Sequence, residues 1–468
     1  MSALADLLVQ ENTLVSQIQA IEDSLSGVRV HIAELRSINR GARTYNLPSE
    51  ILSAIFEAGI TEMPKTRERR RNALLFDQSE VERTTRFELL VSSVSRRWRD
   101  VALQTPRLWS VLVIDVLELT HDLYDLYLHR SKMCPLDITL NYSYGDSLRS
   151  EDCVKRHLDR LVPHVGRWRK FVVRSGFIGS QLSALSHLCA PALETLVLDF
   201  TTNQPEIELF SGGAPRLSSL ELIGAKFRLP LGAVKYLTLS RTSYGSLLSY
   251  DQVSRLFEPI RSLTHLSIAT KIAQDAGNHP LIELPSVLVL DIYFNHHDTD
   301  SNALRILDFS AVESLTIHSH TNVAIRALTW NHRVYPHVQS LTLANDSEYG
   351  DRGNAPVAIA LDFISLLPAI RDVVFQGTNP CAILDVLHNR KSTDEVLWSD
   401  LSAITVVAAG RARVMQKKQI WACIVKVVEN RVQLGQPISS IKLSPQIVEH
   451  GGQRQKQRLR EQTALTEC

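Results

Sequence analysis

The sequence is poor in cysteine, and its charges nearly cancel. Its six cysteines form no Cys-x-x-Cys pair, so the sequence predicts neither a metal site nor a disulfide framework; they are Cys134, Cys153, Cys189, Cys381, Cys423 and Cys468. The 51 Lys and Arg against 50 Asp and Glu leave a net charge of +1. This balance argues against the positive surface of a nucleic-acid-binding protein. We therefore expect a chain of a reducing compartment, cytoplasmic or nuclear, that binds no nucleic acid.

Long apolar runs are also missing. No uninterrupted apolar stretch of about 18 residues occurs, so we expect no membrane-spanning segment. The first residues lack a basic region and include Asp6 and Glu11, which argues against a secretory signal. The 44% apolar and 22% charged residues are typical of a globular protein, and 468 residues suggest about three structural units.

A heptad pattern occupies residues 1–40. Its apolar positions recur in alternating steps of three and four residues: Leu4, Leu7, Glu11, Leu14, Ile18, Ile21, Leu25, Val28, Ile32, Leu35 and Asn39. Nine of these eleven positions are Leu, Ile or Val, which favours a coiled-coil helix. Five heptads are short for a stable isolated dimer. Self-association and packing against another part of the chain therefore both remain open.

Two amphipathic helices are predicted between residues 45 and 110. The first begins near Pro48, which suits the first turn of a helix, and is predicted to continue to residue 57. The second is predicted over residues 87–102 and ends before the Thr-Pro-Arg-Leu-Trp segment at 105–109. Two short helices cannot bury all of their apolar residues against each other. A partner protein or another domain must therefore cover the rest.

Three motifs in this region resemble an F-box, the helical module that docks on the Skp adaptor of cullin-RING ubiquitin ligases. They are Leu-Pro-Ser-Glu-Ile-Leu at 47–52, Ser-Arg-Arg-Trp at 95–98 and Thr-Pro-Arg-Leu-Trp at 105–109. With the heptad leader, they are most similar to F-box-like proteins of mushroom-type fungi, over about residues 1–145. The resemblance implies that ten residues face the adaptor or support that face: Leu47, Pro48, Ile51, Leu52, Ile55, Phe56, Leu90, Val94, Trp98 and Val101.

One departure from the F-box pattern is an insert at 60–86 between the two helices. It contains the densest basic run of the chain, Lys65 to Arg71. Such a run fits a nuclear-localisation or nucleic-acid patch. Because no aromatic residues flank it, we favour a solvated loop.

A six-residue pattern Φ-x-x-Φ-x-Φ, where Φ is apolar, recurs from Trp168 to Leu443. The middle Φ residues of its eleven copies are Phe171, Leu196, Leu220, Leu237, Leu266, Leu290, Leu315, Leu341, Val373, Ile404 and Ile441. Their spacing of 17 to 37 residues resembles irregular leucine-rich repeats, with one short parallel strand per turn. The resemblance is imperfect, because the Asn or Cys that the family places after each strand is matched here only by Asn295. A different mixed α/β domain with several parallel strands is the alternative.

Alternation along such strands places the residues between the apolar anchors on the open face of the sheet. We expect a target protein to bind there, on a lining of mixed charge. The candidate binding residues are Asp199, Glu221, Tyr236, His265, Asp291, Tyr293 and His318.

Catalytic motifs are scarce. A Gly-Asp-Ser-Leu string at 145–148 matches one esterase family, with Ser147 as nucleophile, and Asp385-x-x-His388 resembles the remainder of its triad. These fragments are expected on distant repeats, so the esterase function is a remote alternative. A cluster at His296–Asp298 is better explained as a polar loop than as a metal site. We predict neither enzymatic activity nor a cofactor.

The sequence thus predicts an α/β chain of four parts. These are a coiled-coil helix at 1–40, an F-box-like region at 45–110, a leucine-rich-repeat-like α/β horseshoe of parallel strands at 111–446, and a polar tail at 447–468. The resemblance implies a substrate-recruiting subunit of an SCF-type ubiquitin ligase that binds a Skp-type adaptor and an unknown target. A ligase-independent scaffold that uses the repeats and the coiled coil is the alternative.

Overall fold

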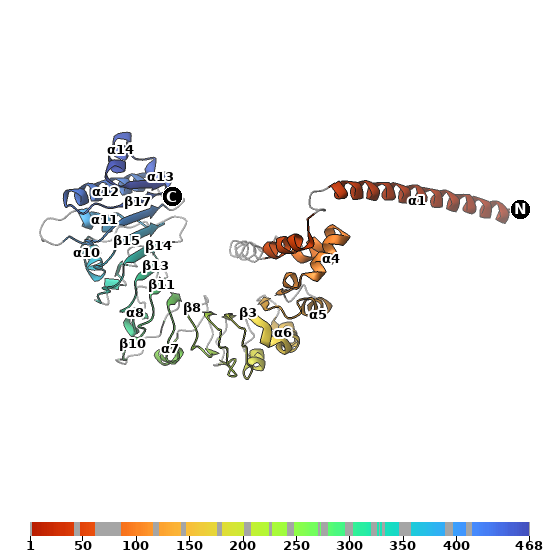
Figure 1. Ribbon diagram of the computed structural model, residues 1–468, viewed down its shortest axis with the longest axis horizontal. Helices are drawn as coiled ribbons and strands as arrows, with labels where there is room; N and C mark the ends of the chain where they lie inside the picture. Colours follow the sequence, from red (N-terminus) through yellow and green to blue (C-terminus); the bar gives the residue numbers. More distant parts are fainter. Residues whose placement is uncertain are drawn as a thin grey trace. The chain divides into compact units, whose positions relative to one another are not determined.

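The computed structural model (Figure 1) describes most of the chain. The described residues are 2–41, 47–60, 86–115, 121–141, 147–175, 180–200, 207–223, 227–240, 248–269, 272, 279–294, 303–319, 325–326, 328–329, 333–345, 357–388, 396–408 and 414–467. The chain divides into two compact units. One comprises residues 1–111 and 125–134, and the other comprises residues 112–124 and 135–468.

The first unit is helical. It contains α1 (Ser2–Gly41), a helix over residues 49–60, α3 (Phe87–Val94), α4 (Arg96–Gln104) and the 3-10 turn η2 (Pro106–Trp109). The heptad segment is therefore one continuous helix, and its apolar residues from Leu14 to Ile32 are exposed. The predicted single helix over 87–102 is wrong, because the helix is interrupted at Ser95. The basic insert, including Lys65 to Arg71, lies outside the described residues.

The second unit is a mixed α/β fold built on a large parallel sheet. Among the described residues, fourteen strands join in the order β1-β2-β3-β4-β6-β8-β9-β11-β13-β14-β15-β16-β17-β18. The strands are β1 (Val111–Asp115), β2 (Leu136–Asn141), β3 (Trp168–Ser175), β4 (Thr195–Phe200), β6 (Ser219–Ile223), β8 (Tyr236–Ser240), β9 (His265–Ala269), β11 (Val289–Tyr293), β13 (Ser314–His318), β14 (Ser340–Ala344), β15 (Asp372–Gln376), β16 (Ala403–Val407), β17 (Ser440–Leu443) and β18 (Ala464–Glu467).

The connections between these strands contain helices and two small sheets. The helices are α5 (His121–Arg130), α6 (Ser147–Leu161), η3 (Val162–Arg167), η4 (Ser180–Leu185), α7 (Tyr250–Phe257), α8 (Ala303–Ile306), α10 (Val357–Leu366), α11 (Cys381–His388), α12 (Val414–Gln433), α13 (Pro445–Val448) and α14 (Gln453–Gln462). The small sheets pair β5 (Ile207–Glu208) with β7 (Phe227–Arg228) and β10 (Ile282–Glu283) with β12 (Leu307–Asp308).

The repeated apolar pattern forms the core of the large sheet. The middle residue of each predicted copy pairs in register with its counterpart in the next strand, from Phe171 through to Ile441. These residues are buried, as are the apolar residues two positions later. Each strand thus buries two side chains on the same face and stacks them on identical positions of its neighbours, so one continuous core joins successive turns.

The sheet is longer at both ends than the pattern indicates. Ile138 of β2 pairs with Phe171 before the first predicted copy. At the other end, Leu465 of β18 pairs with Ile441. The expected polar tail at 447–468 is therefore wrong, because most of these residues form α14 and the last strand. α14 is attached to α12 by an ion pair between Arg458 and Glu429.

Candidate interaction surfaces

The helix over residues 49–60 has one buried and one exposed apolar edge. The carbonyl of Pro48 accepts hydrogen bonds from the amides of Ile51 and Leu52 at 3.1 Å, so Pro48 precedes the first helical turn. Leu52 and Phe56, four residues apart, are buried. Ile51 and Ile55, also four residues apart, are each 47% exposed. The same helix therefore contributes to the core and presents a second apolar edge to solvent.

The break at Ser95 redirects the chain between α3 and α4. Ser95 is fully extended, with φ of −158° and ψ of 166°, and its hydroxyl accepts a hydrogen bond from the amide of Trp98 at 3.2 Å. A serine in this position satisfies one of the amides at the start of α4. The hydrophobic pattern continues without interruption across the break, so periodicity alone predicts one helix.

The core of the first unit joins the three helices through close contacts. The ring of Phe56 lies 5.2 Å from that of Trp98 on α4. A Cβ atom added to Gly59 would lie 2.3 Å from the ring of Phe87, so glycine is what allows the helix to approach α3 this closely. The Ser53 and Thr105 hydroxyls are 2.8 Å apart. These contacts fix the helices as one body.

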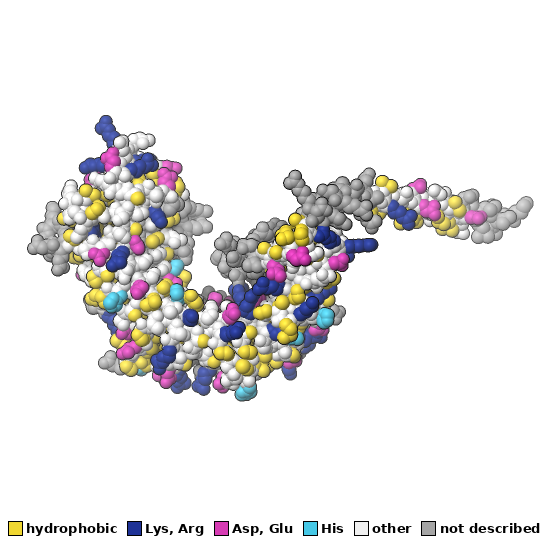
Figure 2. All heavy atoms as spheres, in the orientation of Figure 1, with side chains coloured by type: hydrophobic (Ala, Val, Ile, Leu, Met, Phe, Trp, Pro, Cys, Tyr) yellow, Lys and Arg dark blue, Asp and Glu magenta, His cyan; other side chains and the backbone are white. Residues whose placement is uncertain are grey.

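Apolar side chains remain uncovered on the surface of this body. Ile51 and Ile55 on the first helix, together with Leu90 and Val94 on α3, are each 46–49% exposed. We call these four residues the apolar helical face. Figure 2 shows hydrophobic side chains gathered over these helices. Single exposed apolar residues are normal, but four on two short adjacent helices are typical of an interaction site.

The ten residues predicted to serve the adaptor fall into three groups by burial. Pro48, Ile51, Ile55, Leu90 and Val94 are exposed, whereas Leu47 and Trp98 are partly buried and Leu52, Phe56 and Val101 are buried beneath them. Sequence reasoning did not include Leu89 and Leu103, which are also exposed.

A buried polar contact links α3 to α5. The Tyr127 hydroxyl donates a hydrogen bond to the Glu88 carboxylate, and Tyr127 packs edge-on against Trp109 with ring centroids 5.3 Å apart. Burial, followed by the charge of Glu88, raises the pKa of Tyr127 above its ordinary range. Tyr127 therefore stays protonated and keeps donating to Glu88, which completes the core on which the apolar helical face rests.

The predicted target-binding residues lie on the non-core positions of the large sheet. Two pairs of rings contact each other between neighbouring strands; Tyr293 stacks on His318, whereas Tyr236 is tilted by 34° against His265. Tyr236 and His265 have ring centroids 4.5 Å apart, and Tyr293 and His318 have ring centroids 3.9 Å apart with an interplanar angle of 4°. Asp199, Glu221 and Asp291 occupy other positions on the same face. The sequence pattern predicts these residues one by one and does not predict that their rings contact each other across strands.

The esterase fragments are not brought together. Ser147 begins α6 after β2, whereas Asp385 and His388 lie on α11 after β15. β2 and β15 are second and eleventh in the strand order. At about 4.8 Å per strand step, the two segments are some 40 Å apart along the sheet. Residues 142–146, which contain the start of the Gly-Asp-Ser-Leu string, and 295–300, which include His296 to Asp298, lie outside the described residues.

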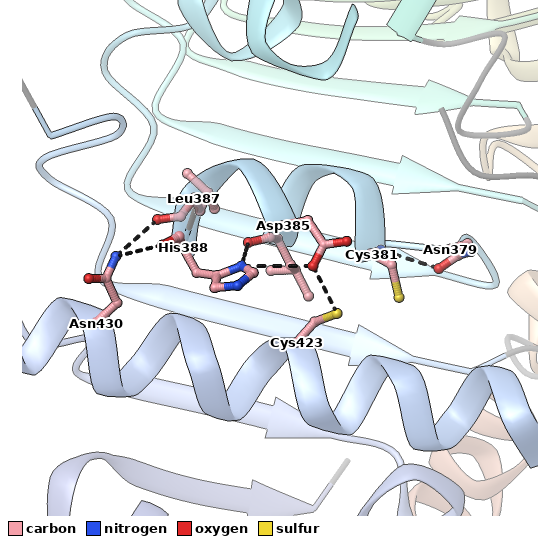
Figure 3. Close-up of polar contacts among 8 residues, drawn as sticks. Asn379, Cys381, Asp385, Leu387, His388, Cys423 and Asn430 are labelled. Carbon is pink, nitrogen blue, oxygen red and sulfur yellow. Dashed lines mark hydrogen bonds and ion pairs between the residues drawn. The ribbon is translucent and has the colours of Figure 1, made fainter. Parts of the chain in front are cut away.

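One cluster of reactive groups does form, between α11 and α12 (Figure 3). The Cys423 thiol donates a hydrogen bond to the Asp385 carboxylate at 3.3 Å, and the His388 Nδ1 atom lies 3.8 Å from the same carboxylate oxygen. A hydrogen bond with Cys381, burial and the charge of Asp385 raise the pKa of the Cys423 thiol. A thiol held in its protonated form is a weaker nucleophile than a thiolate. The contact of Cys423 with Asp385 joins α12 to α11.

Neither a family model nor a curated protein matches this chain. In the part of the chain that the structure describes, no group of three His, Cys, Asp or Glu side chains could hold a metal ion. None of the described helices combines the length and the apolar character needed to cross a membrane.

Proposed function

We propose that the chain is a substrate-recruiting F-box subunit of an SCF-type cullin-RING ubiquitin ligase. In this proposal the apolar helical face docks a Skp-type adaptor, and the large sheet, read as irregular leucine-rich repeats, holds a target protein. The chain would contribute proximity between the target and the ubiquitin-charged enzyme rather than bond chemistry. It would act in the cytoplasm or nucleus.

The observation that carries this proposal is the exposure of the apolar helical face. Ile51, Ile55, Leu90 and Val94 fall within the region at 45–110 that carries the F-box-like motifs, and each is about half exposed. Among the described residues of the helical unit itself, no side chain covers them to the extent that Leu52 and Phe56 are covered. Phe56 and Trp98 instead form a core beneath them, which supports a rigid, preformed docking surface.

The proposal is tested by co-purification of a Skp adaptor with the full chain. Ile55→Asp places a charge on the apolar helical face and is expected to abolish recovery of the adaptor. The matched control is Leu361→Asp on α10, because Leu361 is 43% exposed and belongs to the other unit. Equal recovery with both variants, or no recovery with the unmodified chain, would refute adaptor docking.

A separate role in assembly is proposed for α1. Its heptad residues Leu14, Ile18, Ile21, Leu25 and Val28 are exposed along one continuous helix, which favours a coiled coil with a second copy. Sedimentation of the full chain and of Ile21→Asp would test this. We expect the unmodified chain to dimerise and the variant to be monomeric, and a monomeric unmodified chain would contradict self-association.

A further inference from the structure

The central strands of the large sheet carry three carboxylates and two histidines but no Lys or Arg. We define the central strand face as the non-core residues of seven neighbouring strands: β4, β6, β8, β9, β11, β13 and β14. In each strand these are every second residue, from Thr195 to Asp199, Ser219 to Ile223, Tyr236 to Ser240, His265 to Ala269, Val289 to Tyr293, Ser314 to His318 and Ser340 to Ala344. Its members include Asp199, Glu221 and Asp291, and no Lys or Arg. Basic residues lie on the flanking strands of the same face: Lys170 and Arg174 on β3, which neighbours β4, and Lys442 on β17, three strands beyond β14.

The acidic groups of this face differ in their surroundings. Asp199 pairs in register with Arg174 of the neighbouring strand β3. Burial raises the pKa of Asp199, and the charge of Arg174 opposes that rise. Asp291 lies in register between Ser267 and Thr316, which carry no charge. Within the described part of the chain, Asp291 makes no hydrogen bond or ion pair, so its carboxylate is available to a ligand.

Aromatic rings lie on the same strands as this carboxylate. Tyr293 follows Asp291 by two residues on β11 and therefore projects from the same face, stacked against His318. The tilted Tyr236–His265 ring pair lies on β8 and the neighbouring strand β9. Tyr236 and Tyr293 are 48% and 43% exposed, and they are the large hydrophobic residues that the described strands of this sheet leave exposed.

We infer that the central strand face binds an arginine-bearing extended segment of a target protein, with a guanidinium group paired to Asp291 and lying against the Tyr293 ring. This inference rests on the proposed role of the sheet in holding a target. A guanidinium group is planar, pairs with a carboxylate through two parallel hydrogen bonds and stacks on aromatic rings. The ammonium group of a lysine offers only a point charge, without the planar shape that allows paired hydrogen bonds and stacking. A neutral or acidic segment would bury the Asp291 carboxylate without a partner, which is unfavourable.

The inference is tested with a fluorescein-labelled ten-residue peptide of Gly and Ser with two Arg residues, titrated into the full chain and followed by fluorescence anisotropy. The comparison peptide replaces Arg by citrulline, which keeps the shape and removes the charge. Asp291→Asn is expected to weaken binding of the arginine peptide about tenfold, the range for loss of a charged hydrogen bond. The control is Asp372→Asn, at an exposed strand position on β15, and it is expected to change affinity less than about twofold.

The outcomes separate this inference from the proposed function. Equal binding of the arginine and citrulline peptides, unchanged affinity in Asp291→Asn, or no binding of the arginine peptide to the unmodified chain would each overturn the inference. Adaptor co-purification with the same preparation shows whether adaptor docking holds independently. Tyr293→Ala provides a second variant on the same strand. It is expected to weaken binding of the arginine peptide more than binding of a peptide with lysine in place of arginine.

Discussion

Removal of the apolar helical face should eliminate adaptor binding while leaving the fold intact. The perturbation is the fourfold substitution of Ile51, Ile55, Leu90 and Val94 by Ala. Full burial of such a side chain contributes about 1.5–3 kcal/mol, and each of these side chains is about half exposed. Each therefore has about 1 kcal/mol to gain on docking. Together they amount to about 4 kcal/mol, or roughly a thousandfold in Kd.

Isothermal titration calorimetry, with a purified Skp adaptor titrated into the unmodified chain and into the fourfold alanine variant, measures this change in Kd. The unfolding temperature should change little, because the substituted side chains are already half exposed and Phe56 remains beneath them. An affinity within about threefold of the unmodified chain would refute the argument that these four residues form the docking surface. A large drop in unfolding temperature would instead show that they belong to the core.

Three further predictions concern stability and reactivity. Phe56→Ala is expected to lower the free energy of unfolding by about 3–5 kcal/mol, measured by urea denaturation, because the ring is fully buried; a change below about 1 kcal/mol would show a looser core. Gly377→Ala should destabilise by about 2 kcal/mol or more, because φ is +66° and the new Cβ would lie 2.3 Å from a main-chain oxygen. Gly435 also has a positive φ of +72°, but no atom lies within 4 Å of an added Cβ, so Gly435→Ala introduces backbone strain without a clash. We expect it to lower the free energy of unfolding less than Gly377→Ala does. Equal losses in the two variants would show that the clash at Gly377 contributes nothing. Iodoacetamide at pH 8 should alkylate exposed Cys189 much faster than Cys423, whose raised pKa and burial disfavour the thiolate; mass spectrometry showing equal rates would contradict this.

The strands of the large sheet could be predicted because each one repeats a single local requirement. Two apolar residues separated by one position, as in Leu290 and Ile292, must point to the same side of a strand and be buried there. Repetition of that requirement at similar spacing indicates stacked strands. The pattern does not predict the last strand, because the positions three before and two after Leu465 are Gln462 and Glu467. Only the pairing of Leu465 with Ile441 shows that this strand extends the sheet.

Other features depend on residues that are distant in sequence. The contact of Cys423 with Asp385 requires α11 and α12 to pack side by side, and no local pattern specifies that. The ring stack of Tyr293 on His318 likewise depends on the register of β11 and β13. The break at Ser95 is local, but a capping serine within an uninterrupted apolar stripe gives a weaker signal than the stripe itself.

Amide hydrogen exchange of the full chain with and without a purified Skp adaptor tests the central claim most directly. The account predicts that the adaptor slows exchange at residues 49–60 and in α3, the two segments that carry the apolar helical face. Exchange on β4 to β14 should be unchanged, because that part of the sheet is proposed to serve the target. Protection confined to the sheet, or no protection anywhere in the chain, would contradict the account.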